Sequence, residues 1–131
     1  MKLVILAFLQ ATWTVDPAPV LTIGDINGDV TFTEVMGATR LEDGSVIVGD
    51  RQTAYALQRY SADGTLLKNF ARKGLGPGEI DYLARMWRCG DSLFTHDIVA
   101  ERINVYALDG TCAHVPVWWA GGRQPIPFRL Q

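Results

Sequence analysis

The sequence lacks long apolar runs and a strong bias of charge, which are the features of membrane-spanning and nucleic-acid-binding proteins. No apolar run approaches the roughly 18 residues of a membrane-spanning helix, so no membrane span is expected. Neither sign of charge dominates, because 12 basic and 14 acidic residues leave a formal charge of −2. With no basic stripe, nucleic-acid binding through phosphates is not expected either. A hydrophobic fraction of 48% is typical of a globular chain and excludes a disordered one.

Cysteine is scarce as well. The two cysteines, Cys89 and Cys112, are not in the Cys-x-x-Cys spacing of redox and zinc motifs. The repeat described below places them on the first and fourth strands of one sheet, about 14 Å apart at about 4.8 Å per strand. A disulfide needs Cα atoms within about 7 Å. We therefore expect two free thiols.

The first residues have the composition of a leader. Met1 and Lys2 precede seven apolar residues at positions 3–9. A positive charge before a short apolar run is typical of a secretory signal. The pattern predicts export, with a first β-strand and a start site inside a longer leader as the alternatives. We assign residues 1–19 to this leader and a linker.

A repeat of about 47 residues organises the rest of the chain. Residues 38–50 and 85–97 each contain an apolar-rich strand, a turn of Gly and Asp, and a second strand. The aspartates that close these second strands, Asp50 and Asp97, are 47 residues apart. No stretch shows convincing helical periodicity. Four short strands in each unit of about 40–50 residues describe a blade of a β-propeller.

The repeat predicts an all-β fold, a partial β-propeller with two four-stranded antiparallel blades. A third, partial copy aligns Ile23 with Phe70, again 47 residues apart, and predicts one extra N-terminal strand, Val20–Gly24. The predicted segments are a partial unit at 20–35, a first blade at 36–80, a second blade at 81–117, and an irregular tail, rich in Trp and Pro, at 118–131.

Asp-Gly pairs mark the hairpins of this pattern. Such a pair between two alternating strands predicts a type I′ turn, whose central residues need positive φ. We expect a structural role for the residues of all three pairs, which are Asp43-Gly44, Asp63-Gly64 and Asp109-Gly110.

The glycine-rich stretch Gly76-Pro77-Gly78-Glu79 is predicted to be a structural loop. A phosphate-cradling loop would end in Lys and Ser or Thr and lead into a helix, and neither feature follows here. We expect the glycines to supply bends between the outer strand of one blade and the inner strand of the next, stiffened by Pro77.

These elements together resemble a known family. The pattern of residues 38–50 and the Gly-Pro-Gly-Glu loop are similar to those of bacterial six-bladed β-propellers of the NHL-like type. The resemblance covers roughly residues 20–117, about two blades of the six. In such families the N-terminal strand often completes the last blade, which would suit Val20–Gly24. The resemblance therefore implies a piece of a longer propeller, and the alternative is self-association of three copies to close one ring.

No residues form a catalytic or metal-binding constellation in the sequence, and no cofactor is expected. Asp50 and Asp97 share one repeat position, so we expect both to cap neighbouring turns. His96 adjoins Asp97 on a strand and must point to the opposite face, which makes a poor dyad. His114 is isolated. The stretch at 25–29 resembles the start of a calcium loop, but Met36 stands at the position of the bidentate Glu, which favours an ordinary turn.

The adjacent Trp118 and Trp119 are the candidate contact residues. Side chains alternate along a strand, so both cannot enter one core unless the site is buried on two sides. Packing is the favoured interpretation, and an exposed contact for a protein partner or a sugar is the alternative. The function expected is a non-enzymatic binding module of unknown protein or small-molecule ligand. The alternatives are a fragment of a propeller enzyme of the hydrolase or lyase type and a truncated remnant without independent function.

Overall fold

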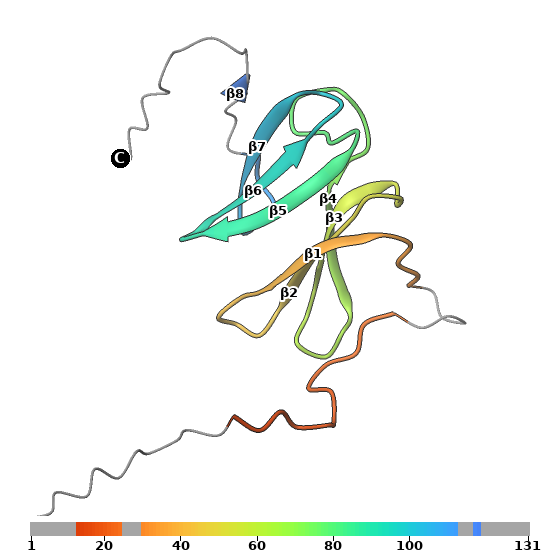
Figure 1. Cartoon of the computed structure of the whole chain (residues 1–131), viewed down its shortest axis with the longest axis vertical. Helices are drawn as coiled ribbons and strands as arrows, with labels where there is room; N and C mark the ends of the chain where they lie inside the picture. Colours follow the sequence, from red (N-terminus) through yellow and green to blue (C-terminus); the bar gives the residue numbers. More distant parts are fainter. Residues whose placement is uncertain (1–12, 25–29, 113–116, 119–131) are drawn as a thin grey trace, which may run out of the picture.

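The computed structural model describes residues 13–24, 30–112 and 117–118, and these form two four-stranded antiparallel sheets (Figure 1). Within these ranges no residue is helical, and no helix could cross a membrane. The prediction of an all-β fold with two such sheets is confirmed. The strands, each paired with the next along the chain, are β1 (Val35–Arg40), β2 (Val46–Asp50), β3 (Tyr55–Tyr60) and β4 (Leu66–Arg72) in the first sheet, and β5 (Leu83–Cys89), β6 (Ser92–Asp97), β7 (Arg102–Ala107) and β8 (Val117–Trp118) in the second.

The two sheets have the same strand order, and their first strands share an irregularity at the same position. The register of β1 against β2 shifts between Val35 and Gly37, and that of β5 against β6 shifts between Leu83 and Arg85. Such a shift is a β-bulge, in which one extra residue turns the following side chains to the other face. The equivalence of the two sheets therefore extends to single residues, which the arguments below use.

The hairpins differ from the prediction in their turn type. In the three Asp-Gly turns only the glycine has positive φ, with values of +82° at Gly44, +91° at Gly64 and +85° at Gly110. The N–H of Gly44 donates to the carbonyl of Leu41 at 3.1 Å, and the N–H of Leu41 donates to the carbonyl of Ser45 at 2.8 Å. This is the three-residue loop of a type I turn followed by a left-handed glycine, and the predicted type I′ turn is wrong.

The aspartate side chain explains this choice of turn. The carboxylate of Asp43 accepts the N–H of Ser45 at 2.9 Å, two residues further along the chain. Asp63 and Asp109 accept the N–H groups of Thr65 and Thr111 in the same way, at 3.0 and 2.7 Å. This local bond holds the aspartate in a right-handed conformation and leaves the left-handed one to glycine.

The predicted extra strand Val20–Gly24 is not a strand in the structure. A strand needs a neighbouring strand to take its N–H and C=O groups, and no ladder pairs with these residues. The segment instead lies against the turn between β3 and β4, where a Cβ on Gly64 would approach the carbonyl oxygen of Thr22 to 3.3 Å.

This position is nevertheless the one that the repeat requires. A Cβ on Gly110, the equivalent of Gly64, would approach the ring of Phe70 to 3.0 Å and Cε of Lys68 to 3.4 Å, both in β4. Residues 21–23 therefore lie beside the first sheet as β4 lies beside the second.

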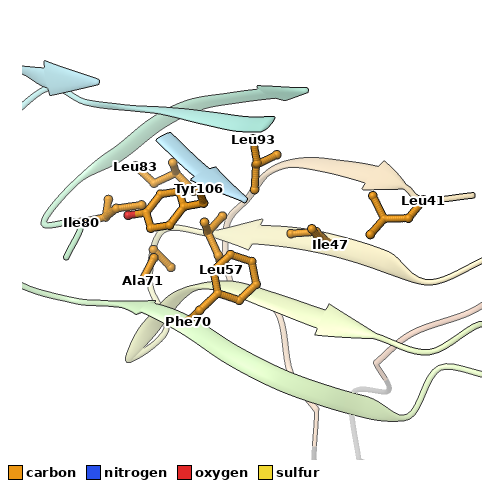
Figure 2. Close-up of a cluster of buried hydrophobic side chains, with 10 residues drawn as sticks. Leu41, Ile47, Leu57, Phe70, Ala71, Ile80, Leu83, Leu93 and Tyr106 are labelled. Atoms are coloured by element: carbon orange, nitrogen blue, oxygen red, sulfur yellow. The ribbon is translucent and has the colours of Figure 1, made fainter. Parts of the chain in front are cut away.

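The hydrophobic core lies between the two sheets (Figure 2). The rings of Phe70 in β4 and Tyr106 in β7 meet edge to face, with centroids 5.9 Å apart. Because both sheets contribute to one core, they stack as expected for a partial propeller. The buried residues of this core are, from the first half of the chain through β4, Leu41, Ile47, Ala56, Leu57, Phe70 and Ala71, and, from the residues after β4, Ile80, Leu83, Leu93 and Tyr106.

The end of the second sheet also differs from the prediction. Trp118 was expected at the start of an irregular tail, but it belongs to β8, where it pairs with Arg102 while Val117 pairs with Ile103. The register explains this, because Val117 opposite Ile103 repeats Phe70 opposite Leu57 in the first sheet.

Candidate functional site

The Gly-Pro-Gly-Glu loop joins the two sheets, and groups of the protein itself hold it. The guanidinium of Arg102 donates to the carbonyls of Leu75 and Gly76, both at 2.9 Å, and to that of Glu79 at 2.5 Å. The carboxylate of Glu79 accepts the N–H of Gly76 at 2.8 Å, and Gly78 has a φ of +72°. The carbonyls of the loop point at a cation of the chain, an arrangement that suits a structural joint and not an anion site.

Asp50 and Asp97 are fully buried carboxylates that hold backbone N–H groups. Asp97 accepts from Asp81 at 2.7 Å and Tyr82 at 3.2 Å, just before β5, and also from the chain that follows β6. Asp50 bonds the equivalent N–H groups before β1, that of Thr33 at 2.7 Å among them. Each aspartate thus fixes the start of the first strand in its own sheet, which is a structural use of a buried carboxylate.

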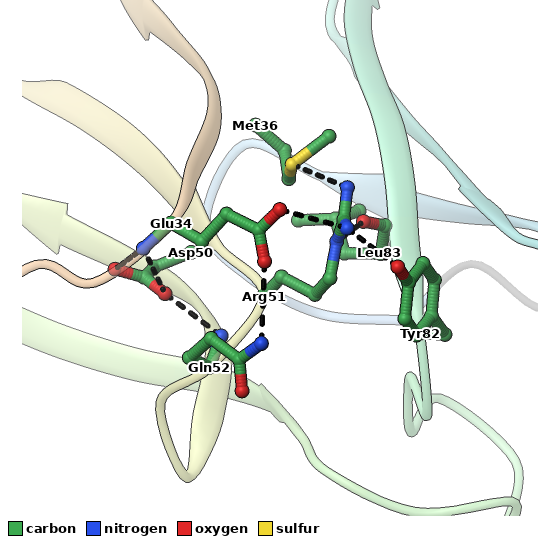
Figure 3. A network of polar contacts seen from close by, with 7 residues as sticks. All are labelled: Glu34, Met36, Asp50, Arg51, Gln52, Tyr82 and Leu83. Atoms are coloured by element: carbon green, nitrogen blue, oxygen red, sulfur yellow. Dashed lines mark hydrogen bonds and ion pairs between the residues drawn. The ribbon is translucent and has the colours of Figure 1, made fainter.

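Arg51 links the two sheets at one edge of their contact (Figure 3). Its guanidinium forms an ion pair with Glu34 at 2.8 Å and donates to the hydroxyl of Tyr82 at 2.6 Å and the carbonyl of Leu83 at 3.0 Å. The guanidinium carbon also lies 4.3 Å from the centre of the Tyr82 ring. This network belongs to the joint between the sheets and offers no open binding position.

Among the residues that the structure describes, none covers the side of the second sheet that faces away from the first. Leu93, Thr95 and Asp97 of β6 are buried toward the first sheet, so the alternate residues of β6 point the other way. A hollow of about 800 Å³ lies on that side. We call this surface the open face and define it by the residues Arg85, Trp87, His96, Ile98 and Ile103.

Trp87 is the largest side chain of the open face. It is 42% exposed and stacks on Phe94, with ring centroids 5.5 Å apart and an angle of 11° between the planes. Ile98, at the end of β6, is 48% exposed. A large aromatic group backed by a second ring forms a rigid, apolar surface, which is the kind of contact that dominates protein interfaces.

The chemistry of the site supports binding more than bond making. Among the residues described, no three His, Cys, Asp or Glu side chains gather closely enough to hold a metal ion. His96 faces the hollow while Asp97 is buried on the opposite side, so the two do not act together. Burial raises the pKa of the Cys112 thiol, which disfavours its thiolate form. Both cysteines are free, as the sequence predicted.

The residues that line the hollow are not the contact residues predicted from the sequence, Trp118 and Trp119. The backbone of Trp118 lies in β8, whereas Trp119, His114 and the possible calcium loop at 25–29 fall outside the described residues. Nothing in the sequence pattern singles out Trp87 as a contact residue. Alternation along β5 and β6 places Arg85, Trp87 and His96 on one face, but only the structure shows that this face is uncovered.

Comparison with known proteins does not extend this description. No protein-family model and no curated protein matches the chain.

Proposed function

We propose that this chain is a non-enzymatic binding module made of two NHL-like propeller blades, and that its open face binds a protein which offers a sheet face of its own. The observation that carries the proposal is the exposure of Trp87 and Ile98 on one side of a sheet whose other side packs on the first sheet. In a propeller each blade is covered by the next one, so this surface is where a further sheet would be expected.

The contents of the open face support a protein ligand. Trp87 and Ile98 offer apolar area on a rigid sheet, and Arg85 gives the surface a polar rim. Apolar anchors surrounded by polar groups are typical of protein interfaces. A small polar ligand would need convergent hydrogen-bonding groups, whereas the guanidinium of Arg102 already bonds the loop between the sheets.

The test uses anilinonaphthalene sulfonate, an anionic fluorescent dye that binds apolar protein surfaces, as a probe of the open face. We expect the dye to bind the wild-type chain and Trp87→Ala to weaken that binding about tenfold, since most of the apolar contact is lost. Leu67→Ala is the control, because Leu67 is 56% exposed on β4 of the other sheet. Thermal melts check that both variants stay folded. Equal dye binding by the two variants would reject the open face as the binding surface.

A further inference from the structure

The contact between the two sheets is built from a hole in the first and a projection from the second. Gly37 of β1 pairs with Gly49 of β2, and the two leave a gap at the surface of the sheet. Met86 of β5 fills it, because a Cβ on Gly37 would lie 2.8 Å from Cγ of Met86 and one on Gly49 2.6 Å from its sulfur. Any side chain at these glycines would have to displace the methionine.

On the outer sides of the two sheets the sizes are reversed: large side chains stand at the positions of the gap, and a small one stands at the position of Met86. Just after the bulge of the second sheet, Arg85 pairs with His96, in the position that Gly37 and Gly49 occupy in the first sheet. The open face therefore carries two large side chains where the inner contact has a hole. On the far side of the first sheet, the exposed residue next to Gly37 is Ala38, the equivalent of Met86. Here a small residue replaces the projection.

The side of the first sheet that faces away from the second is called the reverse face and is defined by its more exposed residues Val35, Ala38 and Val46. Val48 and Tyr60 on the same side are buried. The three defining residues are the equivalents of Leu83, Met86 and Leu93 in the second sheet. Large groups on the open face would thus lie opposite a small one on the reverse face, the opposite of the arrangement at the inner contact. A match of large with small side chains permits the close packing that protein interfaces share with protein interiors.

A second pair of residues at the rim supports the same match. Ile98 follows Asp97 as Arg51 follows Asp50, so Ile98 takes the place of the arginine that bonds the carbonyl of Leu83. The equivalent of Leu83 on the reverse face is Val35, which is 51% exposed. The arginine link of the inner contact would become an apolar contact between Ile98 and Val35, two side chains that are exposed in the single chain.

We propose that the protein bound by the open face is a second copy of this chain, which docks its reverse face there. The inference rests on the proposed function of the open face and names its partner. The two surfaces are different, so the contact is head to tail and can be repeated from copy to copy. With two sheets in each copy, three copies would supply six sheets, the number in the six-bladed propellers that the sequence resembles.

This docking has a consequence for one segment. Residues 21–23 lie beside the first sheet as β4 lies beside the second, with Ile23 at the level of Phe70. In a head-to-tail pair they would occupy the place of β8 on the neighbouring copy, where Val117 pairs with Ile103. β8 has only two residues, and the incoming segment would replace it. Ile23 of one copy would then lie opposite Ile103 of the other.

The first experiment measures mass by light scattering over a wide concentration range. We expect the mass to rise from 14.5 kDa toward that of three copies. Ala38→Glu places a charge in the proposed contact and is expected to weaken association at least about tenfold. Ala18→Glu is the matched control, because Ala18 is exposed in the N-terminal segment. A mass that stays at one copy, or equal association of both variants, would overturn the proposal.

A second experiment tests the register. Chains with Ile23→Cys and chains with Ile103→Cys are mixed under mild oxidation, both with Cys89 and Cys112 replaced by Ser. A disulfide between the two chains is the expected product, and a mixture of Ile23→Cys with Leu67→Cys should give several-fold less. Equal yields would reject the exchange of β8. A chain that binds the dye through Trp87 but never associates would retain the proposed function and refute the second copy as partner.

Discussion

Single residues determine the turns of this fold through two separate effects. In the three Asp-Gly turns only the glycine takes the left-handed conformation. The aspartate before it is held in a right-handed conformation, because its carboxylate accepts an N–H two positions further along the chain. The sequence pattern found all three hairpins, at Gly44, Gly64 and Gly110, but assigned them the wrong turn type. The Asp-Gly pair is common to both turn types, and the side-chain bond that decides between them is visible only in the structure.

Alanine at Gly64 should destabilise the fold more than alanine at Gly90. Both glycines have positive φ, at +91° and +57°, but a Cβ on Gly64 would also press on the carbonyl of Thr22, whereas nothing lies within 4 Å at Gly90. We expect the free energy of unfolding to fall by about 2 kcal/mol for Gly64→Ala and about 1 kcal/mol for Gly90→Ala. Urea titrations measure both, and equal losses would show that residues 21–23 do not pack on this turn.

The turn aspartates should make the fold sensitive to acid. Hydrogen bonds from the Ser45 side chain and N–H lower the pKa of Asp43 below its ordinary 3.8, and bonds from Ser61 and Thr65 lower that of Asp63. A lowered pKa in the folded state means that the unfolded chain takes up protons first as the pH falls. The stabilisation is therefore complete above about pH 4 and is lost progressively below it.

The measurement for this prediction is the stability between about pH 2 and pH 7, again by urea titration. A chain with Asn at positions 43, 63 and 109 should be less stable at neutral pH and show a weaker dependence on pH below about 4. Parallel curves for this variant and the wild type would mean that other carboxylates cause the acid sensitivity.

At the scale of elements, the joint between the sheets depends on β1, β2 and β5. The hydrophobic repeat predicted these strands because alternation and period are properties of the sequence alone. The packing of one sheet on the other was not predictable in the same way. Gly37 and Gly49 had no assigned role, since a glycine gives no hydrophobic signal, and their use as a hole appears only with Met86 in place.

A double-mutant cycle tests this joint. Gly49→Ala should cost about 1–3 kcal/mol in the wild type, because the new Cβ would collide with the sulfur of Met86 and with Leu83. In a Met86→Ala background the same change should cost at least about 1 kcal/mol less, since the sulfur is gone. Additive effects would show that the methionine does not fill the hole.

At the scale of the whole molecule, the two sheets share one core, and we therefore expect them to unfold as one cooperative unit. Residues from both sheets meet at Phe70 and Tyr106, and Arg51 fixes the edge of the contact. The sequence predicted two equivalent four-stranded blades. The sequence could not predict which sheet surfaces are exposed. Side chains alternate along a strand in the same way whether a face of the sheet is packed or exposed to solvent.

Truncation of a core residue in one sheet should therefore destabilise the other sheet as well. Leu93 of β6 has no exposed surface, and Leu93→Ala should lower the free energy of unfolding by about 2–5 kcal/mol. Hydrogen exchange, read strand by strand, should show the loss equally in β2, β3 and β6. A loss confined to the second sheet would mean that the sheets unfold independently.

The loop held by Arg102 also bears on the time course of synthesis. The groups that fix this loop come from β7, which ends at Ala107, whereas the first sheet is complete at Arg72. At about 5–20 residues per second a ribosome needs roughly 2–7 s for the 35 residues between them. During that interval the apolar side of the first sheet, with Ile47 and Leu57, has no cover. The nascent chain therefore passes through a stage at which a chaperone or another nascent chain can bind it.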